Sequence, residues 1–377
     1  MQSFTFNTAA CIAVGAGESR KLGEHCRRLG IERPLLVTDP GLVAIGLVEP
    51  VLEALAADGL SARVFDQVRE DPPEEIVLAA VDMALDGDVD GVIGFGGGSS
   101  MDVAKVVAVL LEAGQSLAEI YGVDQVTGSR LPLILVPTTA GTGSEVTPVA
   151  VITTGETTKA GVSSRALLPD VALLDPDLTI GLPPAVTAMT GIDAMVHAIE
   201  AYTSKIRKNP ISDNLARQAL ALLSENVRTA VHEGYNREAR GNMLLGAMLA
   251  GQAFANAPVA AVHALAYPLG GHYHIPHGLS NSLVLPAVMR FNMPEAERLY
   301  AELSPIVGGG SSAVDLVAEL ESIIKDCDLP ATLSQAKVPE DDLPMLAEDA
   351  MLQQRLLVNN PRDVQLADAL EIYRAAF

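Results

Sequence analysis

The segment Gly91-Val-Ile-Gly-Phe-Gly-Gly-Gly-Ser-Ser-Met-Asp102 joins a short apolar run to a glycine-rich turn and then to a helical pattern. We interpret Gly91–Phe95 as a buried strand and residues 103–111 as a helix. Glycines permit close backbone approach, and the N-terminus of the following helix offers free N–H groups to a pyrophosphate. The turn lacks the third glycine of G-x-G-x-x-G, where Ser99 stands, and it is not a P-loop. A tight turn without a ligand therefore stays open as an alternative.

Strand and helix patterns alternate over the first half of the chain. The predicted strands are Pro34–Thr38, Ala62–Phe65, Gly91–Phe95, Pro132–Val136, Val149–Thr153 and Val171–Asp175. The predicted helices between them are Leu42–Ala57, Pro73–Leu85 and Ser99–Glu112. Such alternation predicts a Rossmann-like α/β domain, in which these strands form a parallel sheet with helices on both faces.

The second half has long segments with helical spacing and no convincing β-branched run. The predicted helices are Thr187–Ser204, Ser212–His232, Arg237–Ala255, Ala313–Asp326 and Asp363–Ala376. The two patterns meet in Asp175–Pro184, where three prolines and a glycine break regular structure. We therefore expect a dinucleotide-binding α/β domain over residues 1–182 and an all-α, metal-binding domain over residues 183–377.

Charge and composition exclude several classes of partner. The net charge of −22 argues against nucleic acid and anionic membranes as partners. The sequence shows no signal-peptide pattern, and no apolar run reaches the ~18 residues of a membrane span. Three widely spaced cysteines indicate a reduced, cytoplasmic protein without a disulfide framework or a cysteine-based zinc site.

A second polar, glycine-bearing segment, Pro137-Thr-Thr-Ala-Gly-Thr-Gly-Ser-Glu145, also follows a predicted strand. Ligands of open α/β sheets bind outside the carboxyl ends of the strands, so two such loops predict a dinucleotide site. Asp39 ends a third strand, and an acid there accepts hydrogen bonds from ribose hydroxyls and repels a 2′-phosphate. This favours NAD over NADP. Asp39 as a simple turn-initiating residue before Pro40 is an equally open interpretation.

Asp193 and His197 stand four residues apart in a predicted helix and therefore share one face of it. With His263 and His277 they make a set of one oxygen and three nitrogen ligands, which suits Fe²⁺, Zn²⁺, Co²⁺ or Mn²⁺. Separate core roles for these side chains remain the alternative. Two further histidines, His272 and His274, compete with His277 as the fourth ligand.

Four motifs together resemble the iron-containing (group III) alcohol dehydrogenases. They are Gly96-Gly-Gly-Ser-x-x-Asp102-x-Ala-Lys105, Pro137–Glu145, Gly191-Ile-Asp-Ala-x-x-His197-Ala-Ile-Glu200, and His263 with His277 after thirteen intervening residues. Asn359-Asn-Pro-Arg362 also resembles that family's C-terminal pattern. The resemblance covers nearly the whole chain. It implies the two-domain architecture shared with dehydroquinate synthase, with the active site in the cleft between the domains.

The resemblance also implies roles for individual residues. The metal, Fe²⁺ or in some members Zn²⁺, is expected on Asp193, His197, His263 and His277. Dinucleotide contacts are expected at Asp39, Gly97, Gly98, Ser99, Asp102, Thr138, Thr139, Thr142, Ser144, Val151 and Lys159.

Two positions depart from the family pattern. Tyr267 stands where relatives often carry a histidine near the nicotinamide, and a phenol with a pKa near ~10 is a poor base. Tyr267, His272 and His274 are therefore alternative candidates for the catalytic proton relay. Asp71 stands before Pro72 where many relatives have asparagine, so it adds a negative charge close to the expected cofactor.

The expected reaction is reversible hydride transfer between NAD(H) and an alcohol/aldehyde or alcohol/ketone pair, with the metal polarising the substrate oxygen. A hydroxyacid–oxoacid transhydrogenase that retains its NAD is an alternative. A cyclase similar to dehydroquinate synthase fits the ligand spacing less well. The resemblance further implies a homodimer or a larger homo-oligomer.

Overall fold

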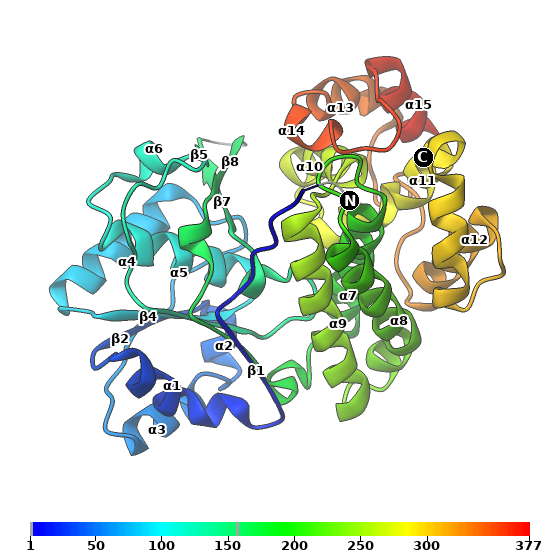
Figure 1. Ribbon diagram of the computed structural model, residues 1–377. Helices are drawn as coiled ribbons and strands as arrows, with labels where there is room; N and C mark the ends of the chain where they lie inside the picture. Colours follow the sequence, from blue (N-terminus) through cyan, green and yellow to red (C-terminus); the bar gives the residue numbers. More distant parts are fainter. Residues whose placement is uncertain (1–2, 156–157) are drawn as a thin grey trace. The chain divides into compact units, whose positions relative to one another are not determined.

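A computed structural model describes residues 3–155 and 158–377 (Figure 1). The chain divides into two compact units. The α/β unit comprises Asn7–Thr139 and Gly143–Thr179, and the helical unit comprises Ile180–Phe377 with residues 3–6 and Ala140–Thr142. The predicted combination of a Rossmann-like α/β fold and an all-α fold is confirmed. Two short segments of the first half of the chain belong to the helical unit.

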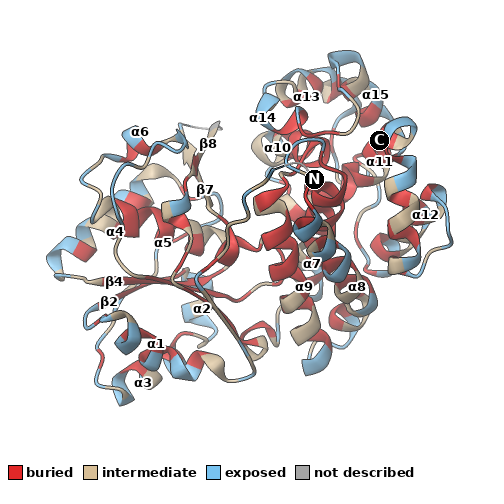
Figure 2. Ribbon diagram, viewed as in Figure 1, coloured by how far each residue is buried: buried red, intermediate tan, exposed pale blue. Residues whose placement is uncertain are grey.

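The α/β unit is built on a six-stranded sheet in which every pair of neighbouring strands is parallel. In sheet order, its strands are β1 (Cys11–Val14), β9 (Val171–Leu174), β6 (Leu133–Pro137), β4 (Gly91–Gly96), β2 (Pro34–Val37) and β3 (Arg63–Phe65). The four central strands, β9, β6, β4 and β2, are buried along their whole length, as expected for a sheet covered on both faces (Figure 2).

Helices cover both faces of this sheet because successive side chains of a strand point to opposite sides. Leu35 belongs to the core with the helices α4 (Glu74–Asp86) and α5 (Gly98–Leu110). Its neighbour Leu36 belongs to the core on the other face, with α1 (Leu22–Leu29) and α3 (Glu49–Ala57). The prediction of a two-sided α/β layer structure is therefore correct.

The strand predicted at 149–153 exists, but its placement in the parallel sheet was wrong. β7 (Val149–Thr154) pairs antiparallel with β8 (Thr158–Ser163), and β5 (Gly122–Val123) completes a separate three-stranded sheet. Only three residues separate β7 from β8, which is too few for the crossover that a parallel connection needs.

The single helix predicted at 42–57 is two helices in the structure. α2 (Pro40–Ala44) ends before Gly46, which has φ 74°, and α3 then begins at Glu49. A left-handed glycine stops one helix, and Pro50 suits the first turn of the next. The remaining elements of this unit are the helix α6 (Leu117–Ile120) and the 3-10 turns η1 (Glu18–Lys21), η2 (Ser144–Val146), η3 (Arg165–Leu167) and η4 (Pro176–Thr179).

Side-chain caps mark the starts of several long helices of the helical unit. Asn209 accepts from Ser212 N at the start of α8, and Ser312 and Asp315 form a capping box on α12. The helices are α7 (Pro184–Thr203), α8 (Pro210–His232), α9 (Arg237–Asn256), α10 (Ala261–Tyr273), α11 (His277–Leu303), α12 (Ala313–Asp326), α13 (Leu343–Ala350), α14 (Gln354–Leu357) and α15 (Leu366–Ala376). The 3-10 turns are η5 (Ser304–Val307) and η6 (Glu340–Asp342).

Within the described ranges, no single helix has both the length and the apolar character needed to cross a membrane. The pair α9 and α10, bent by 107° between Asn256 and Ala261, reaches that threshold jointly, by length and composition alone.

Candidate functional site

Three helices of the helical unit bring the predicted metal ligands together. Asp193 lies on α7, His263 in the first turn of α10, and His277 is the first residue of α11. One potential ligand atom from each of the three lies within 4.8 Å of the others. His277 Nε2 is 3.6 Å and His263 Nε2 is 4.0 Å from Asp193 Oδ1. Asp193 thus lies beside two histidines that follow it by 70 and 84 positions in the chain.

The start of α11 approaches α7 closely because Gly278 follows His277. A Cβ atom at Gly278 would lie 2.3 Å from the carbonyl oxygen of Met189, which is a prohibitive contact with backbone. Because Gly278 has no side chain, α11 can begin in contact with α7 at Met189, which lies one turn before Asp193.

His197 lies next to this group in a stack of rings. Its ring centroid is 4.3 Å from that of Phe254 and 4.7 Å from that of His263. Burial lowers the pKa of His197 to about 3, even though Asp193 opposes the shift. Its Nδ1 is buried and has no hydrogen-bond partner among the described residues. A neutral, buried imidazole beside a carboxylate and a second imidazole fits a metal ligand.

Glu200 orients His263, a role that the sequence analysis missed. The Nδ1–H of His263 donates to Glu200 Oε2 at 2.6 Å, and Val262 N donates to Oε1 at 2.7 Å. The ring therefore carries its lone pair on Nε2, the atom that faces Asp193. Glu200 stands three residues after His197 among apolar neighbours, and a buried carboxylate there needs a partner.

The electrostatics of the site keep the carboxylate ionised. Burial on its own raises the pKa of Asp193, but His197, His277, His263 and the Asn281 amide together hold that pKa below its usual range. The donor set is one carboxylate and three imidazoles, of which Asp193, His197 and His263 are buried while the His277 side chain is 39% exposed. Such a set fits Fe²⁺ or Zn²⁺ better than the oxygen-preferring Ca²⁺ or Mg²⁺.

The three candidates for the proton relay lie in different surroundings. Tyr267 is one turn after His263 on α10, and its ring centroid is 5.9 Å from that of His277. His272 is exposed and bonds Asp349, and His274 is exposed and ends α10 with φ 53°. Of the three, Tyr267 is the one that the described residues place beside a predicted metal ligand.

The predicted dinucleotide loops lie at one edge of the α/β unit. β2, β4 and β6 are parallel neighbours, so their carboxyl ends carry Asp39, Gly97 to Ser99, and Thr138 with Thr139 to the same edge. β2 leads to its neighbour β3, whereas the next strand, β4, lies on the other side of β2 and leads on to β6. The edge between β2 and β4 is therefore a topological switch point, where ligands of such sheets bind. Thr142 belongs to the helical unit.

Backbone geometry makes the turn after β4 suitable for a phosphate. Gly96 has φ 150°, and a Cβ atom there would lie 2.7 Å from Ser100 Oγ. Gly97 caps α5 without a side-chain hydrogen bond, and Gly98 is the first residue of that helix. The first N–H groups of α5 thus lie in a turn lined by glycine backbone. Asp39 also acts as the local capping residue before Pro40. Its Oδ1 accepts a hydrogen bond from Leu42 N at 3.1 Å and caps α2.

Asp102 and Ser144, both predicted as cofactor contacts, take part in a buried network. Ser144 Oγ donates to Asp102 Oδ1 at 2.6 Å, and the backbone N–H of Val151 donates to Asp102 Oδ2 at 2.9 Å. Lys105 Nζ, fully buried, donates to Ser144 Oγ at 2.6 Å and to Val149 O at 2.7 Å. These bonds tie α5 to the loop after β6 and to β7. The sequence motif contained Lys105 but gave no signal of this role.

Lys159, another predicted cofactor contact, forms an ion pair with Asp71. The two charged atoms, Lys159 Nζ and Asp71 Oδ1, are 2.6 Å apart, and half of the Asp71 side chain is exposed. The negative charge that distinguishes this chain at position 71 is therefore balanced locally by the lysine.

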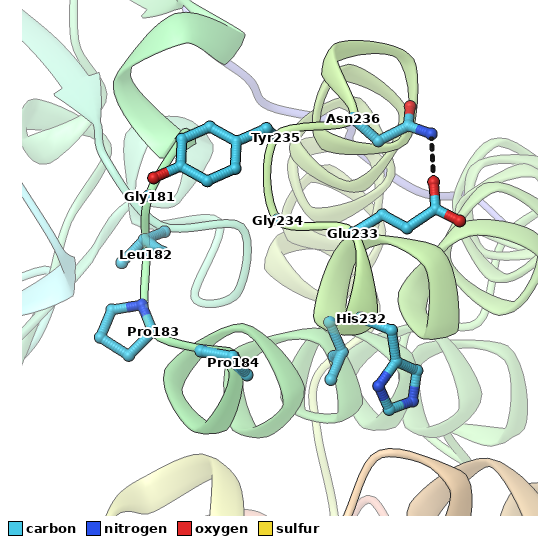
Figure 3. Close-up of a pocket in the computed structure, with 10 residues that line it drawn as sticks. Gly181, Leu182, Pro183, Pro184, His232, Glu233, Gly234, Tyr235 and Asn236 are labelled. Atoms are coloured by element: carbon cyan, nitrogen blue, oxygen red, sulfur yellow. Dashed lines mark hydrogen bonds between the residues drawn. The ribbon is translucent and has the colours of Figure 1, made fainter.

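A pocket of about 570 Å³ lies elsewhere in the helical unit, between the start of α7 and the turn from α8 to α9 (Figure 3). It is lined by residues 181–184 and 231–236. None of these is a predicted site residue, so the pocket is separate from the group around Asp193.

Comparisons with known proteins agree with these observations. Residues 10–176 match the model of iron-containing alcohol dehydrogenase, and residues 187–377 match that of the C-terminal part of the Fe-containing alcohol dehydrogenase family. The chain is 45% identical to long-chain-alcohol dehydrogenase 1 of Geobacillus thermodenitrificans, over 97% of this chain and 94% of the relative. It is similar to a crystal structure of 1,3-propanediol oxidoreductase, with TM-score 0.97, 35% identity and full coverage of both chains. It is also similar to sulfoacetaldehyde reductase from Bifidobacterium kashiwanohense in complex with NAD⁺, with TM-score 0.91, 28% identity and coverage of 100% and 99%.

Proposed function

Because the chain belongs to the iron-containing alcohol dehydrogenase family and is an oxidoreductase, we propose that it interconverts alcohols and aldehydes with NAD(H) and Fe²⁺. The observation that carries this proposal is the convergence of Asp193, His263 and His277, with His197 stacked beside them. Zn²⁺ is the alternative metal, since the same donor set accepts it.

We assign the metal to Asp193, His197, His263 and His277. The bound ion supplies a Lewis acid that polarises the substrate oxygen. Glu200 keeps the His263 ring in the tautomer whose Nε2 lone pair faces Asp193. Phe254 stacks on His197 and limits access of water to that ring.

For the cofactor, we propose that the pyrophosphate of NAD binds at the start of α5, over Gly97 and Gly98. The N–H groups there and the dipole of a helix of thirteen residues favour a dianion, which matters in a chain of net charge −22. Asp39, at the neighbouring strand end, would accept from the adenosine ribose and disfavour NADP. The NAD⁺-bound structure of sulfoacetaldehyde reductase supports this choice.

For the substrate, we propose a primary alcohol and its aldehyde. The relatives reported above are named for a long-chain alcohol, for 1,3-propanediol and for sulfoacetaldehyde, each of which is either an alcohol or an aldehyde. The relatives are named as dehydrogenases and reductases. Their names favour a reaction with free NAD over a transhydrogenase that retains its NAD, and also over a cyclase. We also propose a homo-oligomer, which light scattering of the purified protein would test.

The experiment is removal and return of the metal. The protein is stripped with a chelator, reloaded with Fe²⁺ or Zn²⁺, and given NAD⁺ or NADP⁺ with a series of primary alcohols and diols. We expect metal-dependent reduction of NAD⁺, slower reduction of NADP⁺, and oxidation of NADH by the matching aldehydes. Equal activity of the stripped and the reloaded protein would contradict the proposal.

A further inference from the structure

Asn281 places its side-chain amide among the atoms that we assign to the metal. It lies on α11, one turn after His277, and is fully buried. Its Nδ2 is 2.7 Å from Asp193 Oδ1, 3.3 Å from His263 Nε2 and 3.2 Å from His277 Nε2. One amide nitrogen therefore lies within hydrogen-bond distance of a potential ligand atom from all three residues.

Chemistry fixes the orientation of this amide. With oxygen and nitrogen exchanged, two acceptor oxygens, one of Asn281 and one of Asp193, would lie 2.7 Å apart. His263 Nε2 is also an acceptor, because the Nδ1 of the same ring carries the proton bonded to Glu200. The group that faces these lone pairs is therefore the NH₂ of Asn281, a donor of two hydrogens.

A donor in this position competes with a cation. An ion bound by Asp193, His263 and His277 lies about 2.0–2.2 Å from each ligand atom and uses the same lone pairs. An amide nitrogen has no lone pair to offer a metal, and its hydrogens point toward the ligand atoms. The acceptor nitrogen of a neutral imidazole has one lone pair, so the amide and the ion cannot both use Nε2 of His263.

We propose that Asn281 is a positioning residue that satisfies and aligns the metal ligands before the ion binds and is displaced from them when it does. The inference rests on the proposed function only for the existence of the metal site. Asn281 Oδ1 is buried without a partner among the described residues, so the bonds of its Nδ2 are what hold this side chain in place. Asn281 consequently stabilises the metal-free protein and weakens metal binding.

The test uses Asn281→Leu, which removes the amide but keeps the branched shape of the side chain, and Asn281→Ala as a second, smaller variant. A chelator competition gives the dissociation constant for Zn²⁺, and thermal unfolding is recorded with and without Zn²⁺. The net value of a buried hydrogen bond predicts Zn²⁺ binding about ten-fold tighter in the variants. It also predicts a lower unfolding midpoint for the metal-free variants and a smaller loss once Zn²⁺ is bound.

Ser282→Ala is the matched control. Ser282 is the next residue on α11 and is also buried, and its hydroxyl has no partner among the described residues. We expect Zn²⁺ affinity unchanged in this variant. Weaker or unaltered Zn²⁺ binding in both Asn281 variants would overturn the proposal. The readouts need neither NAD nor an alcohol, so failure of the proposed dehydrogenase reaction leaves this result interpretable.

Discussion

The group around Asp193 and the glycine-rich edge of the α/β unit use their polar atoms in different ways. Around Asp193, side-chain lone pairs of His263 and His277 face one point, which only a donor or a cation can satisfy. At the glycine-rich edge, Asp102 and Lys105 bond to their protein neighbours, and the backbone of the turn after β4 is left for the ligand. In our proposal, side chains therefore bind the metal directly, whereas at the glycine-rich edge they hold in place the backbone that binds the dinucleotide.

The largest effect that this comparison predicts is that of Lys105→Met. Lys105 is fully buried and bonded to Ser144, Thr147 and Val149, and its loss leaves Asp102 and these acceptors without their cation. Breaking a buried charge network costs about 3–5 kcal/mol. We expect a much lower thermal midpoint and weaker NAD binding, with metal content per folded protein unchanged. Lys21→Met, at an exposed ion pair of the same unit, serves as the control. Loss of metal together with NAD binding would contradict the separation of the two roles.

The next effect concerns pH and Glu145, which lies in the same buried region. Burial raises the pKa of Glu145 from the ordinary 4.5 to about 7, although Lys105 opposes the shift. The folded protein therefore holds this proton more tightly than the unfolded chain. Its stabilising contribution is full below pH 4.5 and is lost as the pH rises through about 7.

Replacing Glu145 with glutamine mimics the protonated form. We expect Glu145→Gln to be more stable than the wild type at pH 8, by roughly 3 kcal/mol, and to gain nothing at pH 4.5. Thermal midpoints at pH 4.5, 6, 7 and 8 measure this difference. A gain that is equal at every pH would show that the carboxyl does not titrate in the folded protein.

In the helical unit, Glu200→Gln tests how strongly metal binding depends on the orientation of the His263 ring. Loss of the carboxylate partner of a metal-binding histidine typically lowers metal affinity by about 10–100-fold. We expect that decrease, with NAD affinity unchanged. Glu302→Gln, which alters the carboxylate bonded to Tyr202, is a control in the same unit. An equal loss of metal affinity in both variants would indicate a general effect on folding.

The smallest effect is expected for Asp71→Asn. The Asp71–Lys159 pair is half-exposed, and such pairs contribute about 0–1 kcal/mol. Removal of the carboxylate frees Lys159, so we expect NAD to bind two- to three-fold more tightly at low salt (roughly 0.5 kcal/mol). Glu70→Gln removes the same charge from an exposed neighbour. The same gain in both variants would point to net charge and not to the pair.

Much of the fold was predictable because local patterns agree with it. α12 spans residues 313–326 as predicted, since its apolar spacing and its capping serine are both local signals. α11 was not predicted, because Pro286 and Pro294 interrupt its pattern although the helix continues to Leu303. The β7–β8 hairpin was missed for another reason. Strand partners depend on contacts that a run of β-branched residues does not encode.

The site was predictable where residue type alone carries the chemistry. Histidines and a carboxylate in apolar surroundings indicate a metal, so Asp193, His263 and His277 were predicted as ligands, and the structure brings these three side chains together. Glu200 and Asn281 were missed because their roles depend on which atoms face them, and this is set by the packing of α7, α10 and α11. His272 was a candidate relay from the sequence, but its partner in the structure is Asp349, on another helix.

The central claim is that Asp193, His197, His263 and His277 bind the catalytic metal and that the neighbouring His272 does not. The most direct measurement is the metal content of Asp193→Asn, His263→Ala and His272→Ala after identical loading with Fe²⁺ or Zn²⁺. We predict stoichiometric metal in the wild type and in His272→Ala, and little or none in the other two. Loss of the metal in His272→Ala, or its retention in Asp193→Asn, would contradict the account.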